Sequence, residues 1–419
     1  MLFLFKMAFK NLFRHRLRTL VSIVAIAFSV LIVVFARGYI VGLIDAMIVD
    51  HIHYNSGHIK IVKGEYIEQE RLLPLDCPVD GLEEEGLEEM IAGLNRIDNI
   101  RMVIPRIKFG AMVSTEDELM ALSGWGVDPE KELAFTNIAD YLAEGRMVEP
   151  GKLEVVMGTE LLDKIQRRVG DKVTVAFNTA FNSLSGVTFQ IVGRLESGIK
   201  LLNEVVFFLP LDEAQRILYM DGQATELLVV TSDLKLSDRV LPQVKDYLRE
   251  RGGEVEYAAL GYRETSDLIP WMELAELIYN WIYIFLVLLS SIVVVNTMIM
   301  IVKERTREIG MMAALGLEGR SIMQLFLIEG GIMGVVGSSI GAILGFFLTR
   351  HYADVGIDFT STTEGFSSDI VFDAIIRPAS SLSNTIFAFL LGVVIVTLAC
   401  IIPARKAAKL EPTEAMREA

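Results

Sequence analysis

Few residues in this chain of 419 residues have side chains and spacings that suggest catalysis or metal binding. Three of its five histidines lie close together, as His51, His53 and His58 in the stretch HIHYNSGH. Their alternate spacing could place two of them on one face of a strand as metal ligands, but no further Cys or His follows nearby to complete a site. We therefore expect a surface strand here and no metal site.

The sequence contains no catalytic motif of a common kind. A nucleophile elbow, an HExxH zinc motif and a phosphate-binding loop are all absent. Acidic side chains are plentiful, but a run such as Glu83-Glu84-Glu85 is typical of a solvated helix face. The two cysteines, Cys77 and Cys400, are too few for a disulfide framework. We expect no catalytic residue and no cofactor in this chain.

A binding surface is indicated by the segment 303–317, KERTREIGMMAALGL. Its charged residues come first and its apolar residues follow. This order suits a surface whose apolar side chains enter a cleft of a partner while the charges lie at the rim. An ordinary connecting turn is the alternative. The residues that would carry the docking are Glu304, Arg305, Arg307, Glu308, Ile309, Gly310, Met312, Leu315 and Gly316.

Long apolar runs precede and follow this segment. Hydrophobic residues make up 52% of the chain, and its mean hydropathy is +0.44. Because about 20 helical residues cross a hydrocarbon core of about 30 Å, we predict four transmembrane helices. They lie at residues 20–41, 271–302, 322–349 and 384–402, and the segment 262–302 is expected to be one long helix for most of its length.

Basic residues set the expected orientation. Residues 1–19 form a basic amphipathic segment with five Lys or Arg and no acid, which places the N-terminus in the cytoplasm. Four crossings then make 303–321 a cytoplasmic coupling loop, 350–383 an extracytoplasmic loop and 403–419 a cytoplasmic tail. Arg37 falls near the far end of the first helix, where we expect its side chain to extend into the headgroups.

The large segment 42–270 is expected to be an extracytoplasmic domain. Strand patterns such as 226–231 alternate with helical patterns such as 82–97. It carries 23 basic and 40 acidic residues, a net charge of −17, which argues against nucleic-acid binding. The predicted fold class is an α-helical membrane protein with four transmembrane helices and a large α+β extracytoplasmic domain between helices 1 and 2.

The third apolar run contains a series of glycines. Small residues on one stripe allow a neighbouring helix to approach closely. No Gly-Lys-Ser/Thr follows, so the series is not a nucleotide loop. The glycines that we assign to helix packing are Gly330, Gly334, Gly337, Gly341 and Gly345.

Several of these stretches resemble a known family. The segments ERTREIGMMAALGL, FLIEGGIMGVVGSSIGAILG and PARKAAKLEPTEAMR, together with NLFRHRLRT and VMGTELLDKIQRRVGDKVTV, resemble the FtsX-like permeases of ATP-binding-cassette transporters. The resemblance implies a dimer of four-helix permeases, of the same or of paralogous chains, in a bacterial inner membrane. Each would bind a cytoplasmic ATPase through the coupling loop, and ATP and Mg²⁺ would be held by that ATPase.

Within this family, SGHIKI and the stretch 192–231 are most similar to the lipoprotein-releasing permeases. That resemblance implies extraction of lipoproteins from the inner membrane and transfer to a periplasmic carrier. MacB-type efflux of drugs or peptides and a signalling permease that controls wall hydrolases are the alternatives. From their position at the outer ends of the first two helices, Phe35, Tyr39, Trp271 and Ile278 are candidate acyl-chain contacts.

Overall fold

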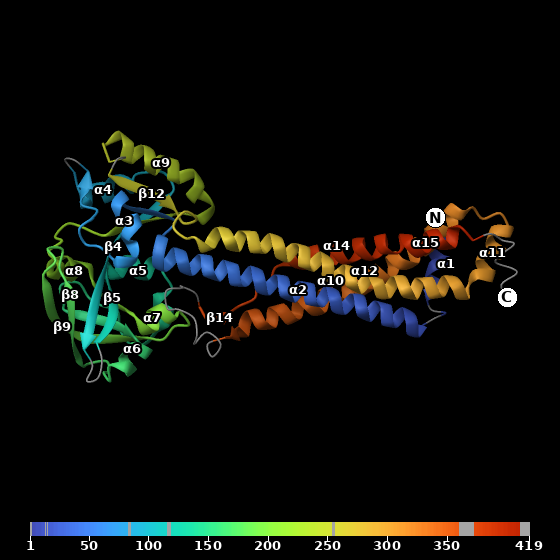
Figure 1. The fold of residues 1–419 in the computed structure, drawn as a ribbon, viewed down its shortest axis with the longest axis horizontal. Helices are drawn as coiled ribbons and strands as arrows, with labels where there is room; N and C mark the ends of the chain where they lie inside the picture. Colours follow the sequence, from blue (N-terminus) through green and yellow to red (C-terminus); the bar gives the residue numbers. More distant parts are fainter. Residues whose placement is uncertain are drawn as a thin grey trace. The chain divides into compact units, whose positions relative to one another are not determined.

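A computed structural model of the chain describes residues 2–12, 14, 16–82, 85–114, 119–253, 256–359 and 373–410. Glu83 and Glu84, part of the loop 350–383 and part of the tail 403–419 lie outside the described residues. Contacts divide the chain into two units. The helical unit comprises residues 1–44, 272–357 and 376–419, and the α+β unit comprises residues 45–271 and 358–375 (Figure 1).

Long helices dominate the helical unit. In chain order these are α1 (Leu2–Leu12), α2 (Arg16–His51), α10 (Leu268–Glu304), α11 (Thr306–Ala314), α12 (Gly319–Val355), α14 (Leu382–Ala399) and α15 (Ile401–Ala408). In the described residues, four helical segments are long and apolar enough to cross a membrane, which confirms the predicted number. The 37 residues of α12 reach about 55 Å, so this helix continues well beyond a hydrocarbon core of about 30 Å.

Three of the α12 glycines face α2. A Cβ added at Gly341 would lie only 2.3 Å from the carbonyl oxygen of Ala27, and one at Gly345 would lie 2.8 Å from the Cβ of Val34. Gly337 is equally close to α2 one turn earlier. Because α12 has no side chain at these points, the two backbones approach closely and gain dispersion contacts in a setting without a hydrophobic driving force.

The other two glycines face the end of α14. A Cβ at Gly330 would lie 2.3 Å from the Sγ of Cys400, and one at Gly334 would be in ordinary contact with Val396, at 3.4 Å. The glycine series of α12 therefore has two partners. Its first two glycines face the end of α14, and only its last three pack on α2.

The close approach predicts different costs for two glycines on the same helix. We expect Gly341→Ala to lower the thermal unfolding midpoint of the detergent-solubilised chain, because its methyl group must push the backbone of Ala27 away, a strain of about 1–3 kcal/mol. The control is Gly331→Ala, whose Cβ would meet only the Thr397 hydroxyl at 3.8 Å. Since alanine is the better helix former, this control should keep or raise the midpoint. Equal midpoints in the two variants would contradict a tight α2–α12 contact.

The α+β unit is built on one mixed sheet. Its strands are β1 (Ile59–Lys63), β4 (Ile100–Ser114), β5 (Leu119–Val127), β6 (Leu142–Gly145), β7 (Glu154–Gly158), β8 (Lys172–Asn178), β9 (Leu184–Leu195), β10 (Val206–Pro210), β11 (Glu226–Thr231) and β12 (Tyr257–Gly261). Their order is β12-β1-β11-β4-β5-β10-β7-β9-β6, and β8 pairs with β4 and β9. The first strand, β1, thus lies between the last two, with antiparallel pairing on both sides.

Shorter elements complete this unit. Its helices are α3 (Gly64–Gln69), α4 (Leu87–Leu94), α5 (Pro129–Phe135), α6 (Thr159–Lys164), α7 (Lys200–Glu204), α8 (Leu211–Leu218) and α9 (Ser237–Glu250). A small hairpin joins β2 (Gly81–Leu82) to β3 (Glu85–Gly86), and β13 (Ile357–Asp358) pairs with β14 (Ile375–Ile376). The α+β class predicted for residues 42–270 is confirmed.

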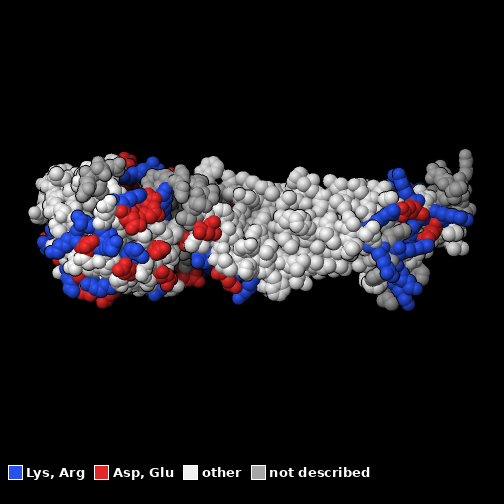
Figure 2. All heavy atoms as spheres, turned by 90° about the horizontal axis from the view of Figure 1, so that it is seen from below, with Lys and Arg blue, Asp and Glu red and all other residues white. Residues whose placement is uncertain are grey.

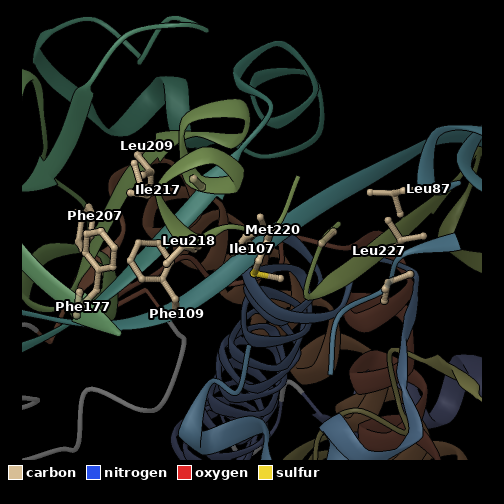
Figure 3. Packing of buried hydrophobic residues seen from close by; sticks show 14 of the residues in the cluster. Leu87, Ile107, Phe109, Phe177, Phe207, Leu209, Ile217, Leu218, Met220 and Leu227 are labelled. Carbon is tan, nitrogen blue, oxygen red and sulfur yellow. The ribbon is translucent and has the colours of Figure 1, made fainter. Parts of the chain in front are cut away.

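Alternation along β4 separates two faces of the sheet. On one face, Phe109 packs edge to face with Phe177 of β8, at 5.6 Å between ring centroids, and with Phe207 of β10, at 5.9 Å. Figure 3 shows these rings converging, with residues of α8 nearby. This face holds the main apolar core of the unit.

The opposite face carries buried charges. Glu226 of β11 is fully buried and pairs with Lys60 of β1 at 2.8 Å and with Lys108 of β4 at 3.0 Å. Burial acts to raise the pKa of the Glu226 carboxyl, but the two ammonium groups outweigh it and lower this pKa to about 2. A buried carboxylate with two cationic partners stays ionised, so these three strands are joined by charge as well as by backbone hydrogen bonds.

The same face holds the chain that follows α2. Arg106 is buried and pairs with Glu132 of α5, with 2.6 Å between Nη2 and Oε1. It also donates to the carbonyl of His53 at 2.7 Å. Lys108 donates to the carbonyl of Tyr54 at 3.2 Å. Cations at these carbonyls satisfy acceptors that the end of a helix leaves unpaired.

This arrangement corrects the strand expected at the histidines. His51 lies in the last turn of α2, and His53 lies in a π-helical turn, Ile52–Ser56, because Arg106 and Lys108 hold the carbonyls there. His51 and His58 instead meet hydroxyl groups, those of Thr265 and Thr231. Among the described residues, no group of three or more His, Cys, Asp or Glu side chains is placed to hold a metal ion.

Candidate functional site

The candidate docking segment begins where α10 ends at Glu304 and α11 starts at Thr306. Arg305 lies between the two helices and is buried, with its Nη1 3.4 Å from Oε1 of Glu329 on α12. Asn11 of α1 donates to the same carboxylate oxygen at 2.6 Å. Glu329 is only 2% exposed. Two helices, α1 and α12, and the junction of α10 with α11 thus meet at one buried carboxylate.

A second set of ion pairs lies closer to the surface. Glu308 accepts from Arg305 at 2.9 Å and from Arg14 at 2.6 Å, and Glu304 pairs with Arg18 at 2.5 Å. Burial acts to raise the pKa of the Glu308 carboxyl, but the hydrogen bonds and charges of Arg305 and Arg14 outweigh it and hold this pKa below its ordinary value of 4.5. Arg14, just before α2, is therefore attached to the first turn of α11, and Arg18, in the first turn of α2, is attached to the end of α10.

Glycine fixes the other end of α11. Gly316 has a φ of +93°, and its N–H donates to the carbonyl of Ala313 while that of Leu317 donates to Met312. This double hydrogen bond is a Schellman motif, which requires a residue that tolerates positive φ. The turn directs Leu317 toward the apolar core and leaves Leu315 88% exposed.

The predicted docking residues divide into a surface set and a supporting set. Glu304, Arg307, Leu315 and Gly316 are exposed, whereas Glu308 and Met312 are half-buried. Arg305, Ile309 and Gly310 are buried within the helical unit, so they hold α11 in place instead of forming its surface. Met311, exposed next to the apolar end of the segment, joins the surface set.

Sequence reasoning did not find the partners of this segment. Arg14 and Arg18 precede the first apolar run, and nothing in their spacing indicates contact with a segment 294 and 286 residues later. Asn11, which contacts Glu329, is separated from it by 318 residues. Glu329 carried a signal, because it is the one charge inside a long apolar run, and such residues usually have a named partner.

Charged side chains gather at this end of the helical unit. Figure 2 shows a belt of the unit without Lys, Arg, Asp or Glu, followed by a cluster dominated by Lys and Arg. Exposed members of the cluster belong to α1, to the start of α2 and to the segment around α11; they include Lys10, Arg14, Lys303, Arg307 and Arg320.

The candidate acyl-chain residues have different surroundings. Phe35 packs edge to face on Tyr352 of α12, with 5.7 Å between ring centroids. Trp271 and Ile278, seven residues apart on one face of α10, are both exposed, at 68% and 52%, and Tyr39 is half-buried. The structure shows an apolar face on α10 but does not bring these four residues into one pocket.

Arg37 has partners on two other helices. Its Nε donates to Asn384 of α14 at 3.1 Å and its Nη1 to Asn280 of α10 at 2.5 Å, while its guanidinium stacks on Phe387 at 4.2 Å. The side chain therefore lies between helices, where two amides and an aromatic ring hold it.

Two family models together match most of the chain. Residues 19–247 match the MacB-like periplasmic core domain, and residues 280–412 match the FtsX-like permease C-terminal region. The chain is an FtsX-like ABC transporter permease. In this family the α+β unit of the permease is the periplasmic core domain, and the four apolar helices make it an inner-membrane protein.

Relatives of the permease have several names. A lipoprotein-releasing system transmembrane protein LolC of Xylella fastidiosa is 22% identical over 325 residues, which cover 75% of this chain and 76% of that protein. The uncharacterized ABC transporter permease YknZ of Bacillus subtilis is 25% identical over 98% of both chains. A macrolide export ATP-binding/permease protein MacB of Marinobacter nauticus is 25% identical over 56% of this chain and 34% of that protein.

The ion pairs of Glu308 give the permease a specific pH dependence. Because the pKa of Glu308 is depressed in the folded state, its contribution to stability is present above pH 4.5 and is lost as the pH falls below that value. We therefore expect Glu308→Gln to have a lower thermal midpoint than the unaltered chain at neutral pH, and this gap should narrow on acidification. Glu318→Gln, at an exposed site directly after the segment, is the control and should show little gap at any pH, because this side chain makes no capping hydrogen bond to α12. A gap for Glu308→Gln that is independent of pH would contradict the ion-pair interpretation.

Proposed function

We propose that this permease couples ATP hydrolysis on a separate cytoplasmic ATPase to movement of its periplasmic core domain, and that the moved substrates are lipoproteins. In this proposal both termini and α11 lie in the cytoplasm, ATP and Mg²⁺ are held by the ATPase, and a second permease subunit completes the transporter. The basic cluster around α1 and α11 supports the orientation, because Lys and Arg are retained on the cytoplasmic side.

The observation that carries the coupling proposal is the exposure of an anchored apolar residue. Leu315 is 88% exposed on a segment whose other side is fixed by Arg305 and Glu329. Leu315 lies next to the exposed Met311, and the charged Glu304 and Arg307 lie at the start of the same segment. This arrangement matches the apolar centre and charged rim of a protein interface. A rigid attachment is also what force transmission needs, since a loosely held segment would absorb movement of its partner.

The docking surface can be tested by co-purification. We expect Leu315→Asp and Arg307→Glu each to weaken capture of the ATPase from membranes at least tenfold, a loss of about 1.4 kcal/mol. The matched controls are Leu17→Asp, at another strongly exposed leucine, and Arg320→Glu, at an exposed arginine on the first turn of α12. Unchanged capture by both test variants would place the interface elsewhere on the permease.

The proposal that the substrates are lipoproteins rests on sequence similarity to LolC and on exposed apolar side chains of α10. The match to LolC covers three quarters of both chains. Exposed apolar residues on α10, such as Trp271, Leu277 and Ile278, offer contacts that acyl chains can use. A periplasmic carrier would receive the released lipoprotein. The match of residues 19–247 to a MacB-like core favours one competing function, export of a drug or peptide.

Depletion of the permease separates these two functions. If it releases lipoproteins, outer-membrane lipoproteins should accumulate in the inner membrane after depletion, because their acyl chains cannot leave the bilayer unaided. Membrane fractionation followed by detection of lipoproteins measures this. If the permease exports drugs or peptides, lipoprotein sorting should stay normal while sensitivity to such compounds changes. Normal sorting after full depletion would overturn the lipoprotein proposal.

A further inference from the structure

A polar cluster lies at one end of the helical unit, far from α11. It joins Arg37 of α2, Asn280 of α10 and Asn384 of α14 through the hydrogen bonds described above. Tyr283 lies one turn from Asn280 on the same face of α10. Its side chain is 3% exposed, and its hydroxyl has no hydrogen-bond partner among the described residues.

The cluster has a cation without a matching anion. Asn280 and Asn384 offer Arg37 neutral carbonyl oxygens, and Phe387 offers the face of a ring. Among the described side chains, no carboxylate forms an ion pair with Arg37. A partly desolvated guanidinium gains most from a charged partner. The cluster is therefore incomplete in charge as well as in hydrogen bonding, because the Tyr283 hydroxyl also lacks a partner.

The depth of the cluster indicates where the missing anion comes from. At about 1.5 Å per residue, roughly 36 Å of α10 separates Asn280 from Glu304. The hydrocarbon core is about 30 Å thick, so if Glu304 lies at one surface, Asn280 lies at the headgroup level of the other. Phospholipid phosphates are concentrated at that level. A guanidinium binds phosphate through two parallel hydrogen bonds, and a phenol hydroxyl can donate a third.

We propose that Arg37, Asn280 and Tyr283 form a binding site for the anionic headgroup of a membrane phospholipid. Asn280 and Phe387 orient the guanidinium, Arg37 supplies the charge, and the Tyr283 hydroxyl donates to a phosphate oxygen. An arginine that merely extends into the headgroups would show no dependence on Tyr283. This site goes beyond the proposed function, because it would hold a resident phospholipid whether the exported substrate is a lipoprotein or not.

Lipid binding to the purified full-length chain in detergent micelles tests the site. The probe is phosphatidylglycerol with a fluorescent acyl chain, and diacylglycerol with the same chains is the comparison that lacks phosphate. We expect Arg37→Gln to weaken phosphatidylglycerol binding at least tenfold and Tyr283→Phe to weaken it severalfold, with little change in diacylglycerol binding. The matched control is Arg350→Gln, at an exposed arginine on α12, which should bind like the unaltered chain.

Each other outcome is informative. Equal binding by Arg37→Gln and Arg350→Gln, or equal binding of the two lipids by the unaltered chain, would overturn the proposal. Displacement of phosphatidylglycerol by inorganic phosphate at comparable concentration would assign the site to free phosphate instead of a lipid.

Thermal unfolding without added lipid checks that the variants are folded. If Arg37→Gln is not folded, Tyr283→Phe decides the question, because it removes one hydroxyl and keeps the packed ring. These measurements need neither ATPase nor lipoprotein, so they can fail independently of the proposed function.

Discussion

A carboxylate buried in apolar surroundings must be paired, and the geometry around α11 follows from that requirement at Glu329. Its partner, Arg305, has to point into the helical unit, so the chain breaks between α10 and α11 at this residue. Asn11 satisfies the same carboxylate and fixes α1 against α12. Removing any one partner would leave buried polar groups unsatisfied. The surface that α11 presents is therefore a consequence of a contact on its hidden side.

Buried charges are also paired in the α+β unit, where more residues take part. Lys60, Lys108 and Glu226 lie on a sheet face that the chain after α2 covers, and each is stable there because oppositely charged groups lie within 3.0 Å. Arg106 and Glu132 form a second buried pair beside them. A buried ionic layer tolerates few alternative arrangements, since a shift in strand register would separate the charges. Hydrophobic packing on the other face contributes area, whereas the charges fix which strands are neighbours.

Sequence patterns predicted the helices and strands that depend on residues close together in the chain. The apolar runs showed four membrane helices, and the strand at 226–231 appears with the same bounds as β11, because its apolar residues are bounded by turns. In contrast, β4 was not recognised as one strand of 15 residues. Pro105 and the buried Arg106 and Lys108 interrupt its apolar pattern, and only distant partners make these residues compatible with a strand. The docking role of segment 303–317 stays a prediction. The burial of Arg305 and Ile309 in this segment depends on contacts with distant helices, which the spacing of its residues could not indicate.

The position of β1 between β11 and β12 has a consequence for biogenesis. Ile59–Lys63 emerges soon after the first membrane helix, yet both strands that pair with it lie more than 160 residues further along the chain. The side of the sheet formed by β12, β1 and β11 cannot close until almost the whole domain has been synthesised and translocated. Contacts of such high sequence separation form slowly and leave strand edges open in the meantime. During that interval the nascent chain is anchored by one helix and exposes the unpaired edges of β1.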